Sequence, residues 1–318
     1  MSTLQHWRMT LATLAISMGL AACGGGGGSD SPTPVPAPTG AAAPQEAGAP
    51  ALTNHISTDG LNWINFRRAQ IGVTVLTRNG VIDNAAQGHS EYQRVNNIVT
   101  HDQTVGKQGF TGVALDHRLL QAGYVFNRNA NFAYGEVISA TTSTSGVYMA
   151  EELITAIYHR FVIFEPRFKE IGTGAATNAA GYAYLTVNFA ANNGYGPGVG
   201  KGNLATWPVN GQTGVTRNFL SDYEAPDPVP ELNEVGYPVS VHADIDVTLS
   251  VSTFSMRPRG EADVTVKVLR RATDTNTPKS AAALVPLSVL RAGTTYDVSF
   301  TGTADGVPIS KNWSFVTK

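Results

Sequence analysis

Apolar residues recur at intervals of three and four along four segments in the first half of the chain. The clearest stretch places Ile82, His89 and Tyr92 on one side, and Asp83 or Asn84 can cap its start. This spacing is typical of amphipathic helices. It predicts helices over residues 61–68, 81–99, 113–122 and 146–161.

Strand-like runs lie between and after these helices, over residues 135–140, 168–174 and 182–190. The last run reads Y-A-Y-L-T-V-N-F, which favours a strand. Helices interleaved with a few strands predict a layered α/β domain, and we place it at residues 52–195.

The hydrophobic period changes to two from residue 237 onward. Val239 and Val241 alternate with small or polar residues, and Tyr296, Val298 and Phe300 do the same. Short alternating strands separated by turn residues predict a small all-β, immunoglobulin-like sandwich over residues 237–318. We expect a spacer or adhesive module there, because no cluster of His, Cys or carboxylates occurs in this part of the sequence.

Two segments have the composition of linkers. Residues 23–51 are rich in Gly, Pro and Ala and cannot bury enough apolar area to offset chain entropy, so they are predicted to be a tether. Residues 196–236 combine Gly, Pro and acidic residues. They are predicted to be a surface-laid connector between two domains that proteolysis can separate.

The N-terminus has the features of a secretory signal over residues 1–22. Arg8 precedes an apolar run of 12 residues, which is shorter than the ~20 residues that span a bilayer. The run ends in Leu-Ala-Ala-Cys, which resembles a bacterial lipobox, and Cys23 is the only cysteine. The resemblance implies an exported protein with lipid on Cys23. Gly24 at the next position implies anchoring in the outer membrane, with the body on its periplasmic or surface face.

Charge and local motifs exclude several function classes. The chain has 22 basic and 24 acidic residues, so nothing suggests the basic surface of a nucleic-acid-binding protein. It contains neither His-x3-His nor Gly-x-Ser-x-Gly, the local signatures of a helical metal site and of an α/β-hydrolase. Any metal site must therefore be assembled from distant positions.

An ordered series of residues runs through the predicted α/β domain and resembles the CAP superfamily. This is the cysteine-rich secretory, antigen 5 and pathogenesis-related-1 group, here in a disulfide-free bacterial form. The resemblance covers about residues 61–190 and implies an α-β-α sandwich with a central cleft. The matching positions are Asn62, Ala86, His89, Ser90, His101, Gly109, Phe110, Thr111, Arg118, Gly123, Tyr124, Gly135, Glu136, His159, Arg160, Pro166, Glu170, Ile171, Gly172, Gly174, Tyr184, Thr186 and Phe189.

In that family two His and two Glu face one another across the cleft. The resemblance assigns His101, Glu136 and His159 to three of these positions, while the second Glu is Glu151, Glu152 or absent. Two imidazoles and a carboxylate are a possible ligand set for zinc, the one cofactor the sequence suggests. The same residues can form a hydrogen-bonded network with shifted pKa values, or hold the cleft together as structural groups.

Four further residues have structural interpretations. His89 lies on the apolar face of its helix, and His117 is expected on a solvated face. Arg118 and Arg160 can anchor helix ends or bind an anion, and we favour the anchoring role.

Three functions remain open at this stage. The first is a cell-envelope lipoprotein whose cleft binds a lipid, a divalent metal or a protein partner. The second is a protease-like or nuclease-like hydrolase that uses the cleft residues, and the third is an adhesive or scaffold protein. The missing nucleophile motif and the unassigned Glu argue against catalysis.

Overall fold

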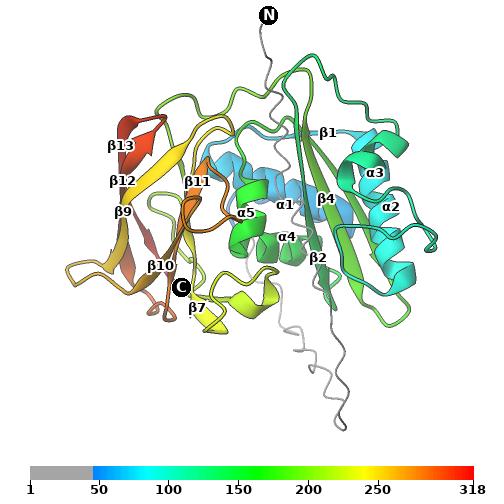
Figure 1. Ribbon diagram of the computed structural model, residues 1–318. Helices are drawn as coiled ribbons and strands as arrows, with labels where there is room; N and C mark the ends of the chain where they lie inside the picture. Colours follow the sequence, from blue (N-terminus) through cyan, green and yellow to red (C-terminus); the bar gives the residue numbers. More distant parts are fainter. Residues whose placement is uncertain (1–45) are drawn as a thin grey trace, which may run out of the picture.

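The computed structural model describes residues 46–318 (Figure 1). The predicted signal peptide, Cys23 and most of the tether lie outside these residues. Within them, every helix is too short or too polar to cross a membrane.

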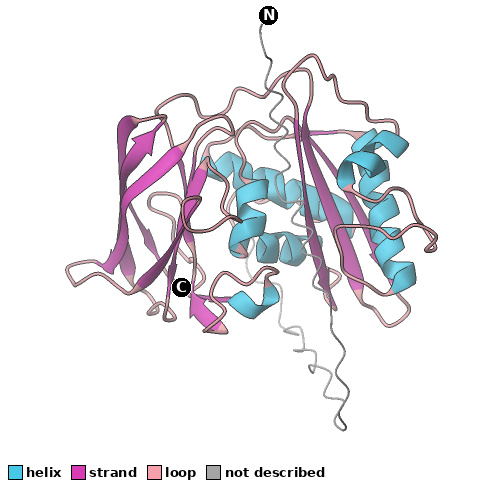
Figure 2. Ribbon diagram, viewed as in Figure 1, coloured by secondary structure: helices cyan, strands magenta, loops and turns pink. Residues whose placement is uncertain are grey.

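The first half of the chain forms a four-stranded sheet between two layers of helices (Figure 2). The strand order is β1 (Thr77–Arg78), β3 (Glu170–Thr177), β4 (Ala183–Ala191) and β2 (Ala133–Thr141). One face carries α1 (Ile56–Ile71), α4 (Gly146–Thr155) and α5 (Ile157–Ile163). The other carries α2 (Gly80–Asn96) and α3 (Leu115–Gln121). The predicted mixed α/β layers are therefore present, and β4 is buried along its whole length, including its polar residues Thr186 and Asn188.

Helix α2 lies directly on β3 because the strand has glycine where the two meet. A Cβ atom at Gly172 or Gly174 would collide with the α2 backbone. The start of α2 differs from the prediction: Asn79 caps it, and its side chain accepts the first N–H groups of the helix, at 2.9 Å from Val81 N. Asp83 instead accepts the β3 backbone N–H of Thr173 at 2.7 Å and so ties helix to strand.

The predicted helix over 146–161 is two helices, because Ala156 has an extended ψ of 121°. Side chains supply the hydrogen bonds that the break removes. Arg160 donates to the carbonyls of Ile154 at 2.5 Å and Thr155 at 3.2 Å, at the end of α4. The Glu224 carboxylate accepts the first N–H groups of α5. Arg160 therefore anchors a helix end.

The second half forms two larger antiparallel sheets and one small one. The four-stranded sheet has the order β10 (Val266–Arg270), β11 (Ala281–Pro286), β8 (Val239–His242) and β5 (Ala205–Trp207). The three-stranded sheet has the order β13 (Val307–Val316), β12 (Thr295–Ala304) and β9 (Leu249–Pro258). The strands β6 (Asn218–Leu220) and β7 (Glu234–Gly236) pair around a 3-10 turn, η1 (Ser221–Tyr223).

The segment predicted to be a surface-laid connector is largely integrated into the fold. It supplies β5, which pairs with β8, and its Trp207 is fully buried. One apolar cluster runs from Leu61 in α1 through Trp207 to Phe300 in β12. The predicted domain boundaries stay predictions, but the two halves share a core because large apolar side chains of the connector fill the space between them.

Candidate functional site

The candidate site is built around Glu136, a buried carboxylate on β2. Neighbouring residues of a strand point to opposite faces. A Cβ at Gly135 would lie 2.7 Å from Val162, so that position faces α5. Glu136 therefore points to the other face, toward α2 and α3, where Arg118 of α3 meets it.

Arg118 neutralises this carboxylate inside the protein. Its Nη2 group donates to both carboxylate oxygens of Glu136, at 2.8 and 2.6 Å, and both side chains are almost fully buried. Burial by itself would raise the pKa of Glu136, but the Arg118 charge and two nearby imidazoles lower it to about 2. Glu136 is therefore ionised at neutral pH. Arg118 also donates to the His101 carbonyl at 2.7 Å and so fixes the loop that carries His101.

His101 connects the buried pair to solvent. Its Nδ1 lies 3.0 Å from Oε1 of Glu136, and its side chain is 41% exposed. An ionised carboxylate only accepts hydrogen bonds, so Nδ1 carries a proton, and in a neutral ring Nε2 carries the lone pair. No residue of the range 46–318 hydrogen-bonds Nε2. The imidazole is thus held in one orientation with one nitrogen available to a ligand.

His89 is a buried residue that hydrogen-bonds the loop carrying His101. Its Nε2 donates to the Thr100 carbonyl at 2.7 Å, and its Nδ1 accepts from the Gln103 amide at 2.9 Å. This pattern requires the neutral ring, and burial lowers the pKa of His89 to about 4. His89 is structural, as predicted, because both of its nitrogens are used to hold the loop that follows α2.

That loop, residues 97–114, is ordered and presents apolar side chains. Gln103 accepts the Thr111 N–H at 2.6 Å, and the Tyr92 hydroxyl accepts the Thr104 N–H at 2.9 Å. These bonds leave several large apolar side chains of the same loop exposed, with Val105 the most open at 71%. The exposed set is Ile98, Val99, Val105, Phe110 and Val113.

His159 does not join His101 and Glu136, contrary to the prediction that the three converge. Its Nδ1 lies 2.9 Å from Oε1 of Glu224. The reason is the alternation along β2: α5, which carries His159, lies on the face of the sheet opposite to Glu136. Within the described residues, no three His, Cys, Asp or Glu side chains are grouped to hold a metal ion. The predicted zinc set of His101, Glu136 and His159 is therefore not assembled.

Neither candidate for the second Glu reaches the site. Glu151 accepts hydrogen bonds from Trp63 Nε1 at 2.6 Å and Arg67 Nε at 2.9 Å. Glu152 interacts with Tyr148, and burial raises its pKa. The carboxylate that partners His159 is instead Glu224, 65 residues further along the chain. Sequence reasoning missed Glu224 because it lies beyond the predicted α/β domain, and its one signal is an acidic residue at the start of a Pro-rich run.

Part of the first half matches a known protein family. Residues 61–189 match the family model of CAP, the cysteine-rich secretory protein family. No curated protein matches the sequence.

Three solved structures are similar to part of the chain. An extracellular protein containing a SCP domain from Bacillus anthracis str. Ames is 22% identical with a TM-score of 0.36, over 42% of this chain and 39% of that one. An outer surface protein from Borrelia burgdorferi is 14% identical with a TM-score of 0.35, over 42% and 89%. Venom allergen-like protein 4 from Schistosoma mansoni is 13% identical with a TM-score of 0.30, over 43% and 88%. The chain thus spans about two fifths of the first of these proteins.

Proposed function

We propose that this chain is a member of the CAP superfamily, because residues 61–189 match the CAP family model. We propose further that it is an exported protein that binds an amphipathic ligand at His101. The observation that carries the proposal is the orientation of the His101 ring. Its Nδ1 is hydrogen-bonded to Glu136, and among residues 46–318 its Nε2 has no hydrogen-bond partner.

The chemistry of this nitrogen suits a ligand with a hydroxyl or acidic head group. A neutral imidazole accepts a hydrogen bond at Nε2, and a charged one donates from it. The buried Glu136–Arg118 pair fixes the ring, so little rotational freedom of the side chain is lost on binding.

The loop that carries His101 also offers exposed apolar side chains that suit an apolar tail. Exposed apolar side chains gathered on one part of a surface often mark a ligand or membrane interaction site. Here exposed apolar side chains belong to the same loop, residues 97–114, as His101. A lipid with a polar head therefore fits better than a fully polar ligand.

A lipid anchor on Cys23 would bring this loop close to its ligand. In the proposal the signal at residues 1–22 exports the chain, and acylated Cys23 holds it in the outer membrane. The tether would then keep the CAP domain within reach of membrane lipids. The support for this part is the N-terminal sequence alone.

Titration of the purified protein with a fluorescent fatty acid tests the binding site. His101→Ala should weaken binding at least fivefold, because it removes the one side chain that is oriented toward the head group. His117→Ala, which changes an exposed histidine on α3, is the matched control and should stay within twofold of wild type. Equal affinities for wild type and His101→Ala would refute the proposal.

General-base hydrolysis is the second candidate, because a carboxylate that orients an imidazole is also the arrangement of a catalytic base. Ester and peptide substrates test it. Activity in wild type that disappears in His101→Gln, with fatty-acid binding retained, would favour hydrolysis over binding.

For the second half we propose an immunoglobulin-like sandwich that begins within the predicted connector. We leave out the separate β6–β7 pair and letter the other strands A to G in chain order from β5. The two sheets then have the orders A-B-E-D (β5-β8-β11-β10) and C-F-G (β9-β12-β13), as in the immunoglobulin fold. An experimental structure in which β5 pairs with a strand other than β8 would contradict this assignment.

A further inference from the structure

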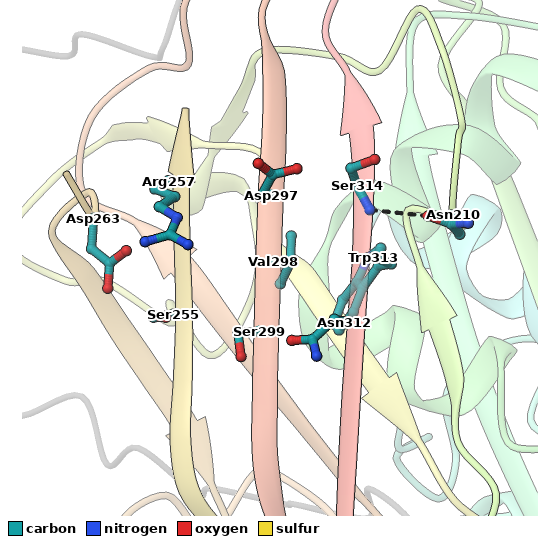
Figure 3. Close-up of a pocket in the computed structure, with 10 residues that line it drawn as sticks. All are labelled: Asn210, Ser255, Arg257, Asp263, Asp297, Val298, Ser299, Asn312, Trp313 and Ser314. Carbon is teal, nitrogen blue, oxygen red and sulfur yellow. Dashed lines mark hydrogen bonds between the residues drawn. The ribbon is translucent and has the colours of Figure 1, made fainter. Parts of the chain in front are cut away.

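The outer face of the three-stranded sheet has a polar hollow of about 540 Å³ (Figure 3). It lies in the second half of the chain, away from His101. Its floor spans all three strands, with side chains at Ser255, Arg257, Asp297, Ser299, Asn312 and Ser314. Asn210 borders it beside β13, and Asp263 borders it beside β9.

Both borders are held in place by hydrogen bonds. The Ser314 N–H donates to the Asn210 side chain at 3.1 Å, and the Gly211 N–H donates to the Ser314 carbonyl at 2.7 Å. On the opposite side the turn that carries Asp263 is closed by the Val264 N–H, which donates to the Met256 carbonyl at 2.9 Å. The hollow is therefore formed by a sheet and two fixed loops.

The floor offers polar groups that the protein itself does not use. Among the described residues, no hydrogen bond is made by the hydroxyls of Ser255, Ser299 and Ser314 or by the Asn312 amide. The apolar lining residues are Val298 and Trp313, and both are buried, at 2% and 5% exposure. The ring of Trp313 packs near Phe254 in the core, 6.2 Å between centroids, so most of the accessible surface of the hollow is polar.

The charges at the hollow balance one another. Asp297 pairs with Arg259 at 2.6 Å, which leaves Arg257 and Asp263 as one positive and one negative side chain. The surface therefore does not select strongly for an anion or a cation.

We propose that this hollow binds a neutral oligosaccharide. Hydroxyl and amide groups both donate and accept hydrogen bonds, which matches the hydroxyls of a sugar. The volume is in the range of ligand sites, about 300–1,000 Å³, but such sites are usually lined by apolar groups. A polar floor with balanced charge fits an uncharged polyol chain better than a lipid, a nucleotide or an acidic polymer.

Calorimetric titration of the full chain with three tetrasaccharides tests the proposal: cellotetraose, chitotetraose and tetragalacturonic acid. At least one of the two neutral probes should bind, and the acidic probe should bind more weakly. Failure of both neutral probes to bind, or tighter binding of the acidic one, would overturn it.

Two kinds of variant locate the binding. Ser299→Tyr fills the floor at an outward strand position, where an aromatic residue is well tolerated, and should abolish binding. Ser310→Tyr makes the same change at an exposed position of β13 outside the hollow and should leave binding unchanged. Asn312→Ala should weaken binding about 3- to 10-fold, as expected for one lost hydrogen bond. Equal effects of the two tyrosine substitutions would overturn the location.

Discussion

Glu224 is the side chain whose removal most directly tests how the two halves are joined. Its carboxylate comes from the segment between them and is almost fully buried. It accepts the N–H groups of Ile157 at 2.8 Å, Tyr158 at 2.7 Å and His159 at 3.1 Å, and it contacts His159 Nδ1 at 2.9 Å. Glu224→Ala would leave these donors of α5 without an acceptor.

The size of the effect follows from these contacts. Hydrogen bonds to a charged group contribute about 1.5–3 kcal/mol each, but bonds to one shared carboxylate are not additive. We expect Glu224→Ala to lower the free energy of unfolding by about 3–5 kcal/mol, the cost of breaking a buried charged contact. Glu224→Gln keeps one oxygen, which can replace the Oε1 that serves Tyr158 and His159. It should cost about 1–2 kcal/mol, mainly for the lost acceptor of the Ile157 N–H.

Urea unfolding followed by both circular dichroism and tryptophan fluorescence measures these differences. The two probes should give one coincident transition for wild type, because the apolar core continues from α1 to β12. Glu231→Ala changes an exposed glutamate of the same segment and should stay within about 0.5 kcal/mol of wild type. The reasoning is refuted if Glu224→Ala is as stable as Glu231→Ala, or if Gln costs as much as Ala.

Three further predictions concern the His101 site and the membrane anchor. The pKa of His89 is about 4 in the fold against 6.5 as its ordinary value, so the unfolded chain binds the extra proton first as pH falls. The stability advantage of wild type over His89→Gln should therefore shrink by about 3 kcal/mol from pH 7 to pH 4, measured by urea unfolding; a constant difference would contradict the buried neutral ring. Arg118→Met leaves the Glu136 carboxylate buried without its countercharge and should cost about 3–5 kcal/mol, and adding Glu136→Gln should restore part of the loss. No restoration in the double variant would argue against the ion pair as the cause. Cys23→Ser should move the protein from the membrane to the soluble fraction of cells, because acyl chains supply the anchoring; a variant that stays with membranes after a high-salt wash would exclude the lipid anchor.

The sequence by itself determined most of the local structure of the first half. Spacing of three and four located α2, α3 and the start of α4 to within three residues, because each of these helices buries one apolar side. It missed the first five residues of α1 and the break at Ala156. The ordered residues of the CAP resemblance located Glu136 on its strand and His101 in the loop beyond α2. The helix positions follow from a short-range pattern, and the places of Glu136 and His101 follow from their order along the chain. A sequence alone contains both kinds of information.

The pattern could not locate elements that are buried on all sides. The six residues of β11 are all buried, so they show no alternation, and this strand went unpredicted. The three residues of β5 lie inside a segment rich in Gly and Pro, where composition favours a linker. The side chain of Trp207 in β5 is fully buried, and this burial favours a strand there. Because the burial arises only when the two halves pack together, the local sequence does not show it.

The partners of His101 and His159 were decided only by the tertiary structure. His101 and His159 looked equivalent in the sequence, and both were expected to reach Glu136. The pleat of β2 turns Glu136 toward α3, while α5 packs on the opposite face and takes Glu224 from a later part of the chain. A carboxylate can satisfy only the donors on its own side of a sheet, and which helices lie on that side is set by the packing of the whole chain.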